Sequence, residues 1–293
     1  MPGIEVDHVT KDYGGGRGNF GVDLAVGDGE VFGFVGANGA GKTTLIRQMM
    51  GFLRPDSGRV RVGGLDAWAD AAAVKRLVGY IPGEIAFPDA PTGAEFLRRQ
   101  ADLLGVADMA RAREIADRLQ LDPSANLKRM SKGMKQKTAV VAAFMADAPV
   151  LVLDEPTTGL DPLMRAEFVE LLAAEKAKGK TVFMSSHMFD EVKDTCDRVG
   201  LIKEGRIVAV ASTDEIRHSR DKVYKIEFAT GAGYSRFLEE GLTLVERRDG
   251  QLQALVSVDG PEVNRLLAVL KGYQLKFVTE VKHTLEAYFR DLH

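Results

Sequence analysis

The sequence predicts an α/β domain built on a mostly parallel sheet, followed by a small α+β domain. Two short segments of continuous apolar character, residues 31–35 and 150–153, are typical of strands buried on both faces of a parallel sheet. A segment with helical character follows each of them, and this order implies right-handed parallel crossovers. Because 293 residues exceed what one hydrophobic core usually holds, we expect a first domain over residues 1–215 and a second over residues 216–293.

The first domain is expected to begin with strands and a glycine-rich loop. Residues 4–14 alternate apolar and polar residues as a half-buried edge strand does, and residues 20–26 form a second strand-like segment. The buried strand at residues 31–35 runs through a glycine-rich loop into a helix over residues 42–50, which a glycine ends. A short alternating strand is expected within residues 54–66.

The middle of the first domain is predicted to be a mostly helical insert. Residues 84–147 contain good helix formers at amphipathic spacing, so we expect a helical subdomain within the sheet-based domain. After the strand at residues 150–153, a helix is expected over residues 164–179 and a strand over residues 181–187. A meander over residues 198–212 completes the domain.

The second domain mixes strand and helix patterns. The expected strands cover residues 222–230, 242–250, 252–258 and 275–281. The expected helices cover residues 233–241, 261–272 and 283–292. This mixture indicates a small α+β domain, and no chemical motif stands out in it.

The composition is typical of a globular protein, with 45% hydrophobic and 28% charged residues. The net charge of −3 argues against a nucleic-acid-binding surface. A single cysteine, Cys196, permits no intrachain disulfide and favours the cytosol. The amino terminus has no signal-peptide pattern, and the most apolar window, residues 140–153, is too short to span a bilayer. We therefore expect a cytoplasmic protein, for which another chain would supply any membrane-spanning part.

The sequence GANGAGKT, from Gly36 to Thr43, predicts a phosphate-binding loop, because it follows a buried strand and opens a helix. Its glycines let backbone amides turn towards a phosphate, where the helix start adds partial positive charge. Lys42 can reach the β- and γ-phosphates of a nucleotide, and the Thr43 hydroxyl can bind magnesium. The expected nucleotide-binding residues here are Gly36, Asn38, Gly39, Ala40, Gly41, Lys42, Thr43 and Thr44.

Acidic residues follow the strand at residues 150–153. Ligands bind at the carboxyl ends of strands in open parallel sheets, so Asp154 is expected to hold magnesium and Glu155 to orient or deprotonate the attacking water. An ordinary solvated pair of carboxylates would be the interpretation without a phosphate loop upstream. His187 ends another buried strand, where it is either a structural residue or a hydrogen-bond donor to the γ-phosphate. Asp161 follows a turn in the same region and is also expected to contribute to nucleotide binding.

Together, and in this order, these elements resemble the nucleotide-binding subunits of ABC transporters, over residues 4–212. The resemblance implies the P-loop NTPase fold of an ABC-type ATPase domain, with its helical subdomain. The segment MSKGMKQK, residues 130–137, is similar to the signature motif of the family, LSGGQ. The resemblance implies that Ser131 and Gly133 contact the γ-phosphate of ATP held by the opposite subunit, whereas Lys132 departs from the pattern.

The same resemblance implies two further contacts. Tyr13 matches the aromatic residue that stacks on adenine, although its interpretation as an edge-strand tyrosine with a solvated hydroxyl stays open. Gly83 stands where the family usually has a magnesium-contacting glutamine. The next residue, Glu84, is a candidate metal ligand or a plain surface acid.

The resemblance implies a function as well: an ATP-hydrolysing subunit that binds ATP and Mg2+ and powers a separate transmembrane permease subunit. Hydrolysis would require a second ATP-binding subunit, in a homodimer or a heterodimer, and would take place on the inner face of the cell membrane. The segments SKGMKQ and LEAYFRDL, the latter residues 285–292, resemble subunits of exporters of drugs, antibiotics and bacteriocins. The alternatives are a soluble ABC-type ATPase that acts on a non-membrane partner and a nucleotide-binding regulator without hydrolysis.

Overall fold

The computed structural model describes residues 3–88, 90–193, 195–214, 221–259 and 262–281. The chain divides into two compact units, Met1–Thr213 and Asp214–His293, each of which is described by itself. The predicted domain boundary between residues 215 and 216 lies outside the described residues.

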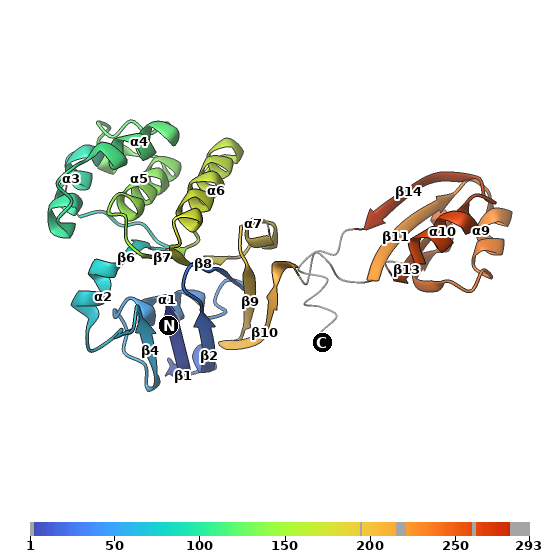
Figure 1. Cartoon of the computed structure of the whole chain (residues 1–293), viewed down its shortest axis with the longest axis horizontal. Helices are drawn as coiled ribbons and strands as arrows, with labels where there is room; N and C mark the ends of the chain where they lie inside the picture. Colours follow the sequence, from blue (N-terminus) through green and yellow to red (C-terminus); the bar gives the residue numbers. More distant parts are fainter. Residues whose placement is uncertain (1–2, 89, 194, 215–220, 260–261, 282–293) are drawn as a thin grey trace. The chain divides into compact units, whose positions relative to one another are not determined.

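The first unit contains a six-stranded sheet with the order β10-β9-β3-β8-β7-β6 (Figure 1). Its strands are β3 (Val31–Val35), β6 (Val78–Ile81), β7 (Val150–Asp154), β8 (Thr181–Ser186), β9 (Arg198–Lys203) and β10 (Arg206–Ser212). All neighbours pair in parallel except β9 and β10. Every residue of β3, β7 and β8 is buried, which confirms the predicted buried parallel strands and brings their carboxyl ends to one edge of the sheet.

A second, antiparallel sheet has the order β2-β1-β4-β5. Its strands are β1 (Ile4–Asp12), β2 (Gly18–Val26), β4 (Ser57–Val62) and β5 (Leu65–Asp66). The prediction that residues 4–14 form an edge strand is wrong, because β1 pairs with β2 on one side and with β4 on the other. Alternation of apolar and polar residues reports that one face of a strand is buried, and it carries no information about lateral neighbours.

The helices of the first unit include α1 (Lys42–Met49), α2 (Ala71–Leu77), α3 (Gly93–Leu104), α4 (Ala110–Arg118), α5 (Lys132–Phe144), α6 (Pro162–Ala177) and α7 (Phe189–Lys193), with a 3-10 turn at Leu127–Arg129. The predicted helical insert consists of α3, α4 and α5, which gather at one end of the unit (Figure 1). The short elements α2 and β6 were not predicted. No helix among the described residues is both long enough and apolar enough to cross a membrane.

The core of the first unit fixes the helix that follows the glycine-rich loop. Leu45, Ile46 and Met49 of α1 are fully buried in a cluster with apolar residues from both sheets. Gly33 of β3 lies so close to Cys196 that an added Cβ would stand 2.9 Å from the Cys196 sulfur. Cys196 is buried, and burial raises the pKa of its thiol to about 12.

The second unit is a βαββαβ arrangement with the sheet order β12-β13-β11-β14, the ferredoxin-like pattern. Its elements are β11 (Asp221–Phe228), α9 (Gly231–Phe237), β12 (Thr243–Arg248), β13 (Gln253–Asp259), α10 (Val263–Leu270) and β14 (Leu275–Val281), with a 3-10 turn at Asp249–Gln251. A core that includes Phe228 and Phe237, with ring centroids 4.7 Å apart, joins the helices to the sheet. The predicted helix over residues 283–292 lies outside the described residues.

Candidate nucleotide-binding site

The glycine-rich loop joins the carboxyl end of β3 to the first residue of α1. Gly39 and Gly41 have φ values of +82° and +109°, which L side chains rarely adopt. A Cβ added to Gly41 would stand 2.8 Å from the carbonyl oxygen of Gly18, so this loop conformation requires glycine. The Lys42 ammonium donates a hydrogen bond to the carbonyl oxygen of Gly36 at 2.5 Å and thereby folds back over the loop.

Asp154 ends β7 and is fully buried. The Thr43 hydroxyl donates to its Oδ2 atom at 2.8 Å, and the Ser185 hydroxyl donates to Oδ1 at 2.5 Å. Gly83 approaches the same carboxylate: a Cβ at this position would stand 2.7 Å from Oδ2. The buried carboxylate is therefore fixed at both oxygens. A side chain at residue 83 would fit only if this carboxylate or the backbone of residue 83 moved.

Glu155 has a φ of +51°, a left-handed conformation that costs a non-glycine residue about 1–3 kcal/mol. Its backbone N–H donates to the Ser185 hydroxyl at 3.0 Å. One carboxylate oxygen lies 3.2 Å from the Lys42 ammonium, in the geometry of an ion pair, and the other lies 2.6 Å from Nδ1 of His187. An ionised carboxylate only accepts hydrogen bonds, so in this arrangement His187 carries hydrogen on Nδ1.

A pocket of about 420 Å3 brings several of the predicted residues together. It is lined by Tyr13, Asn38, Gly39, Gly41, Lys42, Thr43, Thr44, Glu84 and Glu155. Tyr13 stands at the rim with about half of its side chain exposed. Gly36 and Ala40 belong to the loop without lining the pocket, and Asp154 lies beneath it, bonded to Thr43.

Other residues that the sequence pattern did not single out also line the pocket, among them Arg17, Arg47 and Tyr80. Arg47 follows Thr43 by four residues on α1, so helical spacing could have revealed it. Tyr80 could not be found this way, because it reaches the pocket from β6. Burial, together with the nearby charge of Asp154, raises the pKa of the Tyr80 phenol to about 12, so the hydroxyl stays protonated near neutral pH.

Ser131, Gly133 and Asp161 lie away from this pocket. Ser131 is the N-cap of α5, and Asp161 is the N-cap of α6, where their side chains accept hydrogen bonds from backbone N–H groups. A Cβ at Gly133 would stand 2.8 Å from the carbonyl oxygen of Gly159. The start of α5 therefore packs against the segment that follows Glu155.

The side chain of Gln136 adds a second contact between α5 and the segment that follows Glu155. Gln136 of α5 is buried and donates from Nε2 to the carbonyl oxygen of Pro156 at 2.7 Å. Pro156 is the residue directly after Glu155. The segment that contains Ser131 and the turn that contains Glu155 thus belong to one packed assembly within the chain.

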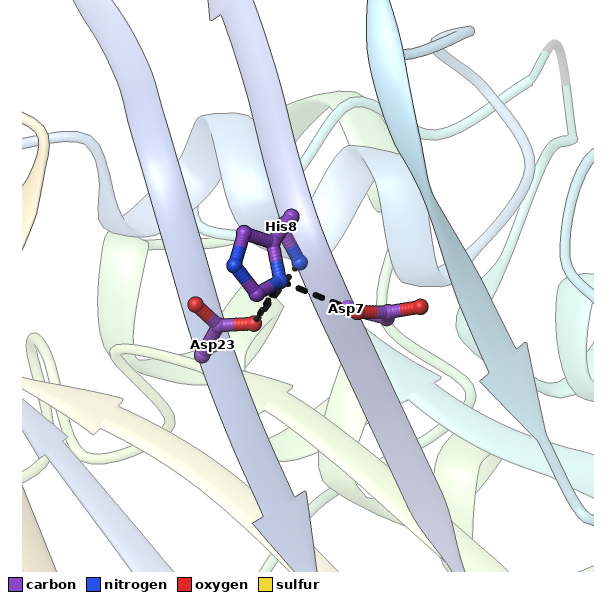
Figure 2. A group of neighbouring side chains, drawn as sticks. All are labelled: Asp7, His8 and Asp23. Carbon is purple, nitrogen blue, oxygen red and sulfur yellow. Dashed lines mark hydrogen bonds and ion pairs between the residues drawn. The ribbon is translucent and has the colours of Figure 1, made fainter.

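A second group of titratable side chains lies on the antiparallel sheet: His8 between Asp7 and Asp23 (Figure 2). The His8 Nδ1 atom lies 3.1 Å from Asp7 and 2.9 Å from Asp23, and all three residues are exposed. The hydrogen bond with Asp7 and the charge of Asp23 raise the pKa of His8. This is the geometry of a surface ion pair, which solvent screens strongly.

Comparison with known proteins decides the family. The model of the family described as "ABC transporter" matches residues 20–158. The chain is 36% identical to the daunorubicin resistance ATP-binding protein DrrA3 of Streptomyces coeruleorubidus, over 73% of this chain and 69% of the relative. It is 34% identical to the daunorubicin/doxorubicin resistance ATP-binding protein DrrA of Streptomyces peucetius, over 93% of this chain and 86% of that one. The chain belongs to the ATP-binding proteins of ABC transporters.

The fold of this ABC subunit agrees with that of a solved ATP-binding subunit of an ABC transporter. The two share 30% sequence identity and superpose with a TM-score of 0.69, over 74% of this chain and 92% of the other. The predicted P-loop NTPase fold of the ABC type is confirmed. The chain is an ATP-binding and ATP-hydrolysing subunit of this family, as the order of its motifs predicted.

Proposed function

We propose that this ABC subunit powers export by a separate membrane-spanning permease, on the cytoplasmic side of the membrane. The observation that carries the chemistry is the convergence of Lys42, Glu155 and His187 above the buried Asp154. The similarity along most of the length of DrrA, a protein named for drug resistance, supports the direction of transport.

The phosphate loop binds the triphosphate of ATP through backbone N–H groups at the start of α1, aided by the partial positive charge of the helix terminus. Lys42 contacts the β- and γ-phosphates, and Tyr13 offers its exposed ring to the adenine at the rim of the pocket. Asn38, Gly39, Gly41 and Thr44 line the pocket in this role, and Gly36 and Ala40 hold the loop in shape through their own backbone hydrogen bonds to Ser186 and Ala37.

The donor set around Asp154 fits Mg2+. This ion prefers hard oxygen ligands, and the Thr43 hydroxyl lies within 2.8 Å of the Asp154 carboxylate. Thr43 would bind the metal, and Asp154 would hold it directly or through water. When bound, the ion would neutralise charge on the β- and γ-phosphates.

Glu155 is the general base in this proposal, and His187 is its partner. Water attacks the γ-phosphorus, the bond between that phosphorus and the bridging oxygen of ADP breaks, and Glu155 takes the proton of the water. His187 keeps its Nδ1 contact with Glu155 and uses Nε2 for the hydrogen bond to the γ-phosphate.

Glu84 takes the place of the missing glutamine. A Cβ at residue 83 would stand 2.7 Å from Oδ2 of Asp154, which disfavours a side chain there, whereas Glu84 lines the same pocket as Thr43 and Glu155. Its carboxylate is a suitable ligand for Mg2+.

Substitution tests the role of Glu84. We expect Glu84→Ala to raise the Mg2+ concentration for half-maximal ATPase activity by about 3- to 10-fold, while Glu84→Gln, which keeps an oxygen ligand, has a smaller effect. A magnesium titration of steady-state phosphate release measures this. Glu114→Ala, at an exposed position on α4, is the matched control. An unchanged magnesium requirement in Glu84→Ala would make Glu84 a surface acid.

Ser131, Gly133 and Asp161 act on ATP held by a second ATP-binding subunit. All three lie outside the pocket of their own chain, so they contribute to a nucleotide site only where two subunits face each other. A homodimer or a heterodimer provides this arrangement. ATP joins the subunits, and loss of the γ-phosphate lets them separate, which converts hydrolysis into motion.

The permease docks at an apolar groove of about 530 Å3 between the central sheet and the helical insert. Met50, Phe52, Ile85, Phe87, Phe96 and Leu103 are among the residues that line it. Leu103 and Phe52 are 77% and 50% exposed, unusual values for large apolar side chains unless a partner covers them. The groove and the nucleotide pocket share Tyr80 and Pro82 in their linings, and Ile85 and Phe87 of the groove follow Glu84 closely in the sequence.

Purification from membranes tests this function. We expect the chain to co-purify with a polytopic membrane protein, and Leu103→Arg to reduce the yield of that protein by at least about tenfold, since burying an unpaired charge is costly. Leu267→Arg, at a half-exposed position on α10 in the other unit, serves as the control. Recovery of a cytosolic partner instead, with no membrane protein, would contradict a transport function and favour a soluble ABC-type ATPase.

A further inference from the structure

We propose that Ser185 is a positioning residue for ATP hydrolysis, whose hydroxyl holds Asp154 and Glu155 in a single arrangement. Neither the phosphate loop nor the acidic strand end contains this residue, which lies in β8. The inference rests on the roles proposed above for Asp154 and Glu155, and it adds a residue that links them.

The pairing of two strands places Ser185 at the site. β7 and β8 run in parallel, and their register sets Ser185 opposite Asp154. The Ser185 hydroxyl donates to Oδ1 of Asp154 at 2.5 Å and accepts from the backbone N–H of Glu155 at 3.0 Å. The residue is fully buried, so bulk water does not compete for either bond. One hydroxyl therefore connects the proposed metal-holding residue to the proposed general base.

The bond to Asp154 orients its carboxylate. Asp154 is fully buried, and a buried carboxylate is stabilised by donors to its oxygens. With Thr43 on Oδ2 and Ser185 on Oδ1, the carboxylate plane is fixed from two sides. Loss of the Ser185 hydroxyl would leave Oδ1 short of a donor and free the carboxylate to rotate towards other donors.

The bond to Glu155 supports an unfavourable backbone conformation. The φ of +51° at Glu155 is one that L side chains rarely adopt, and such conformations persist where the surroundings hold them. The Ser185 hydroxyl accepts the N–H of this residue and thus fixes the point from which the Glu155 side chain leaves the backbone. Without this acceptor the turn can relax and move the carboxylate away from the attacking water.

The neighbouring serine shows that this role belongs to the position and not to the residue type. Ser186 is equally buried, but its hydroxyl bonds to Glu191 and to the backbone of Met188. Ser185 does not line the nucleotide pocket. Its loss should therefore lower turnover and leave the metal-free affinity for ATP unchanged.

Kinetics of Ser185→Ala provide the first test. At saturating ATP and Mg2+, we expect kcat to fall about 10- to 100-fold, the effect of losing a hydrogen bond to a charged group. Thr181→Val is the matched control, because it removes an equally buried hydroxyl from the opposite end of β8, where Thr181 contacts Gly27 and Gly29. Thermal melting of both variants checks that they are folded.

A binding measurement provides a readout apart from turnover. The affinity for a non-hydrolysable ATP analogue is measured by calorimetry, with Mg2+ and with EDTA. In Ser185→Ala we expect the affinity measured in EDTA to equal that of the wild type. Most of the increase in affinity that Mg2+ produces in the wild type should be lost. Should Ser185→Ala melt at a much lower temperature than Thr181→Val, Ser185→Cys, which keeps the size but donates weakly, is judged by the same criteria.

Two results would overturn the inference: a kcat within about twofold of wild type with unchanged Mg2+-dependent tightening, or equal losses in Ser185→Ala and Thr181→Val. Glu155→Gln is assayed alongside. If it abolishes turnover while Ser185→Ala does not, the proposed role of Glu155 stands and that of Ser185 fails. If Glu155→Gln has no effect, the underlying proposal fails first.

Discussion

Replacement of Glu155 by glutamine is expected to lower kcat for ATP hydrolysis by about 100- to 10,000-fold, the contribution of a general base. Glutamine keeps the size of the side chain but cannot take a proton from water. Because the phosphate loop is untouched, ATP binding should remain, and the ATP-bound dimer should accumulate, since the step that separates its subunits is blocked. Phosphate release reports the first effect, and size-exclusion chromatography with ATP reports the second.

A suitable control for this variant is Glu170→Gln. Glu170 lies on α6, where its exposed carboxylate forms only a distant ion pair with Arg118 at 3.6 Å. The same chemical change there should leave turnover within about twofold of wild type, as surface ion pairs contribute little. If Glu155→Gln behaves like this control, Glu155 is not the base.

Replacement of Lys42 by alanine is expected to weaken ATP binding by at least about 100-fold, because several charge-assisted hydrogen bonds to the phosphates are lost together. Lys42 is 6% exposed, its ammonium lies between Gly36 and Glu155, and the described lining of the pocket contains no other lysine to replace it. Calorimetric titration with ATP measures the change.

Lys271→Ala is the control for this second substitution, because Lys271 is exposed at the carboxyl end of α10 in the other unit. The melting temperature of Lys42→Ala should stay near that of the wild type, since the loop keeps its glycines. An ATP affinity within about threefold of wild type would disprove the assignment of the phosphate loop, because even one charge-assisted bond accounts for more.

The nucleotide site was largely predictable, because its parts follow strands that any parallel sheet brings to one edge. Asp154 ends one buried strand, His187 directly follows another, and the loop before Lys42 follows a third, so sequence order was enough to expect them together. The family resemblance was needed for Ser131 and Gly133, which lie away from the pocket and carry no chemistry visible in one chain.

Features that depend on which strands lie side by side, and in which register, could not be predicted from the sequence. The role of Ser185 arises from the register between β7 and β8, and the constraint on Gly83 arises from its distance to a carboxylate on a strand far along the chain. The wrong prediction that β1 lies at an edge has the same origin. The alternation of apolar and polar residues shows which face of a strand is buried, but it does not show which strands lie beside it. The order of strands in the ferredoxin-like unit likewise depends on pairing and not on local pattern.

The buried thiol of Cys196 has a practical consequence for spectroscopy. With its pKa raised to about 12 and its sulfur packed against Gly33, this thiol hardly forms the nucleophilic thiolate near neutral pH. The sequence has no other cysteine. A cysteine placed at an exposed position would therefore take up a maleimide dye or a nitroxide label with little background, without prior removal of the native residue. Distances between labels on two copies could then follow each round of opening and closing in the working ATPase.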